Sequence, residues 1–196
     1  MLREIKSAVI AVAVITAVLG LGLPALMTGF AQVAFKHQAN GSLITLNGHV
    51  VGSELVAQAF TKPQYFHERP SATTPPYNGG GTTFANLGPT NPALAKAVKQ
   101  AADGILKLEG PYNPGLSIHQ IPVDAVTTSG SGIDPDISPA YAQLQAPRVA
   151  SVRHLPLTTI EKLIAQNTDN RSLGFLGEPG INVLKLNLAL DRLGGK

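Results

Sequence analysis

The chain has 196 residues, a length that suits one ordinary domain with a short additional segment and is too small for two full domains. With a net charge of +3, no Lys/Arg cluster and 5% aromatic residues, it lacks the basic surface that nucleic-acid binding requires, so no nucleic-acid partner is expected. The absence of cysteine excludes disulfides, thiolate metal sites and a cysteine nucleophile.

The N-terminal segment carries no charge from Ser7 to Phe35, and its most apolar part runs from Ala8 to Met27. A helix needs about 20 apolar residues to cross a hydrocarbon core of ~30 Å. We therefore predict a transmembrane helix over residues 8–30, embedded in a lipid bilayer. The alternative is a cleaved secretory signal with Gly29-Phe30-Ala31 as its cleavage site, but the apolar run exceeds the usual core of about 7–15 residues.

The charges that flank this helix predict its orientation. The short segment before the helix carries three positive charges, from Arg3, Lys6 and the amino terminus, and one negative charge, from Glu4. Only Lys36 and a neutral histidine follow the helix. Because positive charge is retained on the cytoplasmic side, residues 1–7 are expected to be a cytoplasmic tail. Residues 31–196 are then a soluble extracytoplasmic domain, outside the inner (cytoplasmic) membrane of a bacterial cell.

The expected elements of this domain mix helices and strands, which predicts an α+β fold. Helix Asn91–Gly110 has a capping Asn, Pro92 at its first position and an apolar stripe predicted to face the core: Leu94, Val98, Ala101, Ile105 and Leu108. The other predicted segments are a strand at 42–46 beside an Asn-Gly turn at 47–48, a helix at 54–60 capped by Ser53, an irregular loop at 62–92, a strand at 121–126, an irregular loop at 128–139, a helix from Ser138 to about 152, a helix from Thr158 to about 166, a strand at 181–188, and fraying at Gly194 and Gly195.

The motifs of independent enzymes are missing. The glycine run at 79–81 is not followed by Gly-Lys-Ser/Thr, no G-x-S-x-G serine is present, and no two histidines are spaced as paired metal ligands. Asp134 and Asp136 could together bind Ca²⁺ or share a proton. The favoured alternative is an Asp-Pro turn that positions the helix beginning at Ser138.

Several ordered motifs resemble the C subunit of Kdp-type potassium-transporting ATPases (KdpC). They cover nearly the whole chain: residues 52–60 (GSELVAQAF), 63–72 (PQYFHERPSA), 86–92 (NLGPTNP), 129–139 (SGSGIDPDISP), 148–150 (RVA) and 174–187 (GFLGEPGINVLKLN). The chain departs from the family pattern in the glycine run 79–81 and at Gly180-Ile181, where Arg-Val is more usual. Both departures lie in loop-like segments.

The resemblance implies a non-catalytic accessory subunit of a high-affinity, ATP-driven potassium uptake pump. Its partners would be a channel-like A subunit that carries K⁺, a P-type ATPase B subunit and a small F subunit, and the C subunit would support assembly and raise the ATP affinity of the B subunit. The chain would bind no cofactor of its own, since K⁺ and ATP with Mg²⁺ are handled by the partners. No catalytic or metal-binding residue is assigned, and the residues expected to contact partners or shape these motifs are Arg69, Asn86, Asn91, Asp134, Asp136 and Asn182.

Two alternatives remain open from the sequence. The chain could be a free-standing, membrane-anchored extracytoplasmic binding protein that uses the loop at 62–92 as its site. It could also be an anchored hydrolase that uses Ser131 or the Asp134/Asp136 pair.

Overall fold

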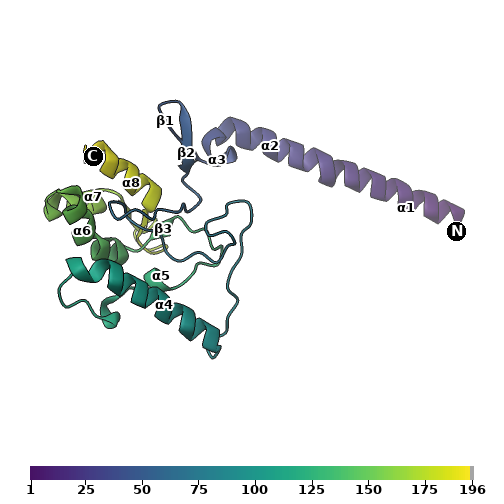
Figure 1. The fold of residues 1–196 in the computed structure, drawn as a ribbon. Helices are drawn as coiled ribbons and strands as arrows, with labels where there is room; N and C mark the ends of the chain where they lie inside the picture. Colours follow the sequence, from purple (N-terminus) through teal and green to yellow (C-terminus); the bar gives the residue numbers. More distant parts are fainter. Residues whose placement is uncertain (195–196) are drawn as a thin grey trace. The chain divides into compact units, whose positions relative to one another are not determined.

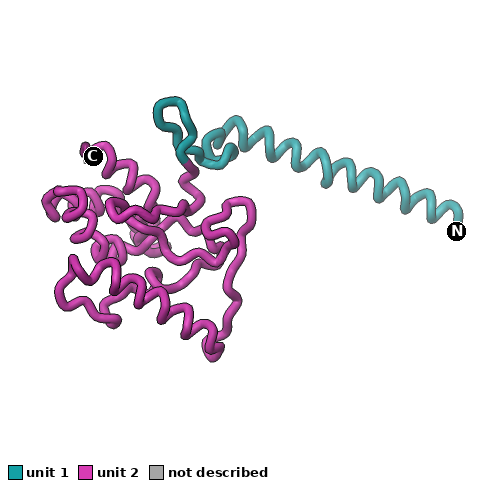
Figure 2. The backbone as a smooth tube through the Cα atoms, viewed as in Figure 1, with its two compact units in different colours: residues 1–51 teal, residues 52–196 magenta. Residues whose placement is uncertain are grey.

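The computed structural model of the chain describes residues 1–194, and the fraying expected at Gly195 lies outside these residues. The chain divides into two compact units, residues 1–51 and residue 52 to the C-terminus (Figure 2).

The first unit is dominated by a helix of 33 residues, Leu2–Ala34, whose mean hydropathy reaches 2.5. It is long and apolar enough to cross a membrane, spanning roughly 50 Å at 1.5 Å per residue. Within it, α1 (Leu2–Ile15) passes through a π-helical segment, η1 (Thr16–Gly22), into α2 (Leu23–Ala34). The π-helical segment lies directly before Pro24, whose ring would crowd the carbonyl of Gly20 in a regular α-helix.

A short helix, α3 (Lys36–Ala39), and a two-stranded sheet follow, and the second strand of this sheet runs past residue 51 into the second unit. Strands β1 (Leu43–Leu46) and β2 (His49–Ser53) are joined at Asn47-Gly48, where both residues have positive φ. Asn and Gly tolerate this backbone conformation, which two-residue hairpin turns require. The predicted strand and turn are confirmed.

The second unit contains four longer helices: α4 (Pro92–Glu109), α6 (Pro139–Arg153), α7 (Leu157–Gln166) and α8 (Val183–Arg192) (Figure 1). Three short helices lie between α4 and α6: η2 (Gly110–Tyr112), η3 (Ile118–Gln120) and α5 (Val123–Val126). Side chains cap α4 and α6 as the sequence predicts, since Asn91 accepts from Ala93 N–H and Ser138 accepts from Tyr141 N–H. The start predicted at Thr158 is wrong by one residue, because α7 begins at Leu157 after Pro156 and has no side-chain cap.

A small antiparallel sheet of order β3-β5-β4 lies among these helices. It consists of β3 (Asp136–Ile137), β4 (Thr168–Asp169) and β5 (Gly180–Asn182), with Ile181 of the central strand opposite Ile137 and Thr168. The core gathers around the sheet from α6, α7 and α8, with contributions from α4 and the irregular segments. Phe66, Val149, Ile160, Ile181 and Leu186 are among its fully buried members. One apolar helix followed by mixed helices and small sheets confirms the α+β prediction.

Three predicted elements are wrong. Residues 54–60 are not helical, because Ser53 accepts from Leu55 N–H in a local turn while Ala57 N–H pairs with the distant Ile133 carbonyl. The segment at 121–126 contains no strand, and its last four residues form the short helix α5. The expected strand at 181–188 ends at Asn182, which caps α8 through Lys185 N–H at 3.1 Å. The loop at 62–92 is irregular as predicted, whereas 128–139 includes the two residues of β3.

Candidate partner-contact site

The irregular segment 63–69 is held in place by side chains from two helices. Asn187 of α8 accepts from Phe66 N–H and donates to Phe66 C=O, both at 2.9 Å. Gln145 of α6 makes the same pair of bonds to His67, at 2.7 and 3.0 Å. Each side-chain amide therefore replaces a neighbouring strand and satisfies backbone groups that would otherwise be buried without partners.

Arg148 of α6 is the fully buried centre of this arrangement. Its Nε donates to Glu109 Oε1 at 2.8 Å, and its guanidinium also donates to the carbonyls of Pro63 and Tyr65. Burial raises the pKa of Glu109, and the charge and hydrogen bond of Arg148 oppose that rise. These contacts tie α4, α6 and the segment before Arg69 together, so the position of Arg69 follows from a packed framework.

Arg69 and Asp134 link two predicted motifs on the surface of the unit. Arg69 Nη1 lies 2.9 Å from Asp134 Oδ2, with side-chain exposures of 19% and 31%. Arg69 also donates to the carbonyl of Thr127, and Asp134 Oδ1 accepts from Asp136 N–H. The structure thus brings three of the predicted site residues together, and the Asp-Pro-Asp sequence forms the turn favoured from the sequence.

These residues line a polar cavity of about 530 Å³ with four carboxylates, from Asp124, Asp134, Asp136 and Glu178. Each carboxylate already has a partner. Asp124 accepts from the backbone and hydroxyl of Ser138, Asp136 accepts from the Asn182 amide, and Glu178 pairs with Arg171. Partial burial raises the pKa of Asp136, and the charge of Asp134 adds to that rise while the Asn182 amide opposes it.

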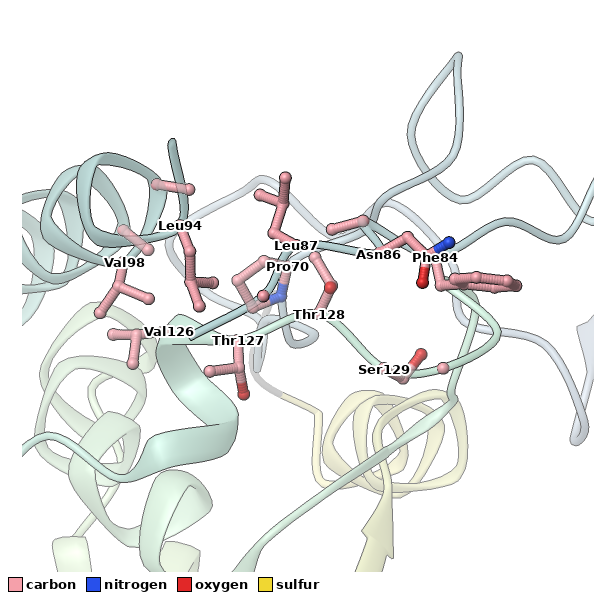
Figure 3. A pocket seen from close by; sticks show the side chains of 15 residues that line it. Pro70, Phe84, Asn86, Leu87, Leu94, Val98, Val126, Thr127, Thr128 and Ser129 are labelled. Atoms are coloured by element: carbon pink, nitrogen blue, oxygen red, sulfur yellow. The ribbon is translucent and has the colours of Figure 1, made fainter. Parts of the chain in front are cut away.

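An apolar cavity of about 520 Å³ shares Thr127 with the polar one (Figure 3). Figure 3 shows Leu94 and Val98 of α4 on one side and Phe84 and Asn86 of the long loop on the other. The N-terminal half of the stripe predicted to face the core therefore lines an open cavity, whereas Ile105 in the other half is buried. Leu87, Pro70 and Val126 complete the apolar lining.

The remaining predicted residues occupy separate places. Asn86, with φ of +51°, lines the apolar cavity, whereas Asn91 lies at the start of α4, where it caps the helix. Asn182 is buried, and besides capping α8 it donates to Glu54 C=O at 2.8 Å and to Asp136 Oδ1 at 3.3 Å. Asn182 therefore joins the Asp136 side of the polar cavity, while Asn91 does not.

The residues of the hydrolase alternative lack the geometry of a nucleophile and its base. Ser131 Oγ lies 3.2 Å from Ser129 Oγ and accepts from Ile133 N–H, and no histidine or lysine is among its hydrogen-bond partners within residues 1–194. In the same part of the chain, no three His, Asp or Glu side chains are grouped to hold a metal ion. The arrangement offers a polar and an apolar cavity that adjoin at Thr127.

Several buried charged residues were not predicted as important. Arg148, Glu109 and Glu68 are all nearly shielded from solvent, and Arg153 pairs with Asp191 at 2.7 Å while its guanidinium lies over the Tyr65 ring. The available signal was the position of Arg148 within the Ala- and Val-rich face of a predicted helix. A charged side chain among apolar neighbours on one helix face indicates a paired, buried charge.

Comparison with known proteins agrees with the motif resemblance. The family model described as "K+-transporting ATPase, c chain" (KdpC) matches residues 5–192. The potassium-transporting ATPase KdpC subunit of Bradyrhizobium diazoefficiens is 49% identical over all of both chains. The KdpC subunits of Methylococcus capsulatus and Sorangium cellulosum are 49% and 50% identical, over 98% and 97% of this chain and 100% and 98% of theirs.

Proposed function

Because this chain belongs to the KdpC family of K⁺-transporting ATPase subunits, we propose that it is a non-catalytic accessory subunit that supports assembly and activity of an ATP-driven potassium pump. The match of the family model over residues 5–192 carries this proposal. The partners are a channel-like subunit that carries K⁺, a P-type ATPase subunit and a small membrane subunit, and these handle K⁺ and ATP with Mg²⁺.

The proposed topology has one transmembrane helix over residues 8–30, a cytoplasmic tail and an extracytoplasmic domain, in a bacterial inner membrane. The helix of 33 residues supports the span, and the charges of Arg3 and Lys6 before it support the orientation. Since the chain has no cysteine, Ser117→Cys creates a single labelling site on an exposed residue. A membrane-impermeant thiol reagent applied to intact cells should label it, whereas labelling only in inverted vesicles would reverse the orientation.

The proposed contact with partner subunits uses the two adjoining cavities. The polar cavity offers the Arg69–Asp134 pair, and the apolar cavity offers Leu87 and Val98 to a protein surface. Protein interfaces combine an apolar centre with a polar rim of this kind. Leu87→Ser and Arg69→Ala should each reduce co-purification of the other pump subunits with this chain.

Lys99→Ala is the matched control, because Lys99 pairs with Asp103 on the exposed side of α4. It should leave co-purification unchanged, and thermal unfolding in detergent should show that all three variants remain folded. Equal co-purification of all three variants would exclude the cavities as the contact surface. A parent chain that purifies as a solitary monomer would instead favour the free-standing binding protein.

An effect on ATP affinity is proposed to pass through the transmembrane helix, because an extracytoplasmic domain cannot reach cytoplasmic ATP. The helix would have to bind two states of the pump differently to shift their populations. A chain lacking residues 1–35 should therefore leave the ATP affinity of a cytoplasmic ATPase fragment unchanged. An increase with that truncated chain would contradict the transmembrane route.

A further inference from the structure

The loop between β4 and β5 presents an exposed apolar tip. Three of four consecutive residues here are exposed and apolar: Leu173, Phe175 and Leu176 are 82%, 69% and 49% exposed. The other large apolar side chains exposed in the second unit, such as Leu55 and Ile118, are not clustered in this way along the chain. Single exposed apolar residues are ordinary on protein surfaces, whereas a cluster marks an interaction site.

The backbone of this loop is closed on itself and does not depend on burying the tip. Leu176 N–H donates to Ser172 C=O at 2.9 Å, and the two residues form an isolated bridge. At the base, Arg171 Nη2 and Glu178 Oε2 lie 2.6 Å apart. Leu173 has φ of +55°, a conformation that is unfavourable for a leucine. The loop therefore keeps an apolar residue exposed at a backbone position where Asn or Gly would be easier to accommodate.

The chain itself supplies a surface that this tip can reach. Residues 35–51 separate the apolar helix from the second unit, and even fully extended they span at most about 60 Å. A unit of this size has a radius of gyration of about 15 Å. A bilayer that holds the proposed span of residues 8–30 is therefore always within reach of the second unit, at the high effective concentration that a short tether imposes.

The chemistry of the tip matches the boundary between lipid headgroups and acyl chains. Leucine and phenylalanine side chains enter this boundary and gain from burying apolar area there. At the base of the loop, Glu178 is paired with Arg171, while exposed Asp169 and the other carboxylates of the polar cavity lie further from the tip's apolar residues in sequence. The loop thus presents an apolar end above a neutral ion pair.

We propose that Leu173, Phe175 and Leu176 insert into the surface of the bilayer that holds the chain's own helix, as a second membrane attachment. The helix and the tip then hold the second unit at two points, which restricts its rotation relative to the membrane. The inference rests on the anchored topology proposed above, and the experiment separates the two.

The test uses the absence of tryptophan from the chain. Phe175→Trp places a single fluorophore at the tip of the full-length protein, reconstituted into phosphatidylcholine/phosphatidylglycerol vesicles with brominated acyl chains. We expect bromine to quench this tryptophan roughly three-fold more than in Ile118→Trp, which places one on an exposed apolar position elsewhere in the unit. Because tryptophan itself favours membrane interfaces, the second variant controls for that preference.

A second variant tests whether the whole tip inserts. Adding Leu173→Ser and Leu176→Ser to Phe175→Trp should remove most of the difference from Ile118→Trp. Equal quenching of Phe175→Trp and Ile118→Trp would overturn the inference. A Phe175→Trp emission shift that appears only when other pump subunits are added, without bromine quenching, would also overturn it, in favour of a protein partner.

Flotation of the vesicles on a density gradient separates the two proposals. If the protein floats with the vesicles while its Trp at position 175 stays unquenched, only the proposed second attachment is overturned. Protein that does not float would overturn the anchor and this inference together.

Discussion

Arg148 Nε lies 2.8 Å from Glu109 Oε1, in an ion pair whose two side chains are 0% and 2% exposed. The same guanidinium donates to the backbone of the irregular segment 63–69. Glu109 Oε2 has no hydrogen-bond partner within the described residues. Arg148 thus balances the charge of Glu109 and also holds the segment 63–69 in position.

Arg148→Met should be strongly destabilising. It leaves the Glu109 carboxylate without its cation and frees the carbonyls of Pro63 and Tyr65, so we expect a loss of about 3–5 kcal/mol in the free energy of unfolding. Urea unfolding in detergent, followed by circular dichroism, measures it. Lys99→Ala removes an ion pair that is 72% and 57% exposed, and it should cost less than about 1 kcal/mol. Similar losses for the two variants would contradict the role assigned to Arg148.

Glu68 should make stability depend on pH. Burial raises the pKa of Glu68 from 4.5 to about 9, and the charges of Asp134 and Asp136 add to the rise, while the Gln58 N–H opposes it. Between pH 4.5 and 9 the folded chain holds this proton and the unfolded chain releases it. The contribution of Glu68 to the free energy of unfolding is therefore fully present below about pH 4.5. It falls as pH rises, by up to about 1.4 kcal/mol per pH unit.

Glu68→Gln removes this titration. We expect urea unfolding of the variant to match that of the parent near pH 5, and the variant to be more stable by a few kcal/mol near pH 8. The difference between the two proteins isolates Glu68, because the other titrating groups are common to both. If the free energies of unfolding of the variant and the parent changed in parallel with pH, this carboxyl would be ionised in the folded chain.

The two asparagine caps should differ in their contribution to stability. Asn91→Ala removes one hydrogen bond at the exposed start of α4, which typically costs about 1 kcal/mol. Asn182→Ala removes the cap of α8 and also leaves Glu54 C=O and Asp136 without the amide, so it should cost at least about 2 kcal/mol. Thermal unfolding of both variants gives the comparison. Equal losses would mean that the contacts of Asn182 to Glu54 and Asp136 contribute little.

Gly132 should not tolerate a side chain. It has φ of +72°, and a Cβ added there would lie 2.4 Å from the carbonyl oxygen of Thr83. Gly132→Ala should therefore cost at least about 2 kcal/mol, from backbone strain and overpacking together. Gly130, two residues earlier, has no atom within 4 Å of an added Cβ, so Gly130→Ala is the matched control and should unfold like the parent. A variant at Gly132 that is as stable as this control would contradict the close approach of the two loops.

Local signals in the sequence predicted the apolar helix, α4, α6 and α7. The apolar helix is marked by its long uncharged run, and α4 and α6 are marked by the capping residues Asn91 and Ser138, each followed by proline. The C-terminal segment was predicted as a strand because Leu184, Leu186 and Leu188 alternate. In α8, however, the buried apolar residues are Val183, Leu184, Leu186 and Leu190, and Val183, Leu186 and Leu190 recur at helical spacing. A short leucine-rich run fits both periods, and the Asn182 cap favours the helix.

The candidate site was predicted only in part, because most of it depends on long-range contacts. Arg69 and Asp134 are 65 residues apart, and no local pattern shows that they meet. The motifs drew attention to the segments around both residues, but they did not show that the two side chains form a pair. The apolar cavity was not predicted, because the residues of α4 that line it have the same spacing as residues that face a core.

The clamped segment 63–69 has a consequence for engineering the chain. Stretches without regular secondary structure are usually where an inserted residue or an epitope is accepted. Here the carbonyls of Pro63, Tyr65 and Phe66 each meet a particular side chain on a helix distant in sequence. One added residue within the segment would break the register between these carbonyls and their partners, so a stretch that looks like a loop should be as intolerant of length changes as the centre of a β-sheet.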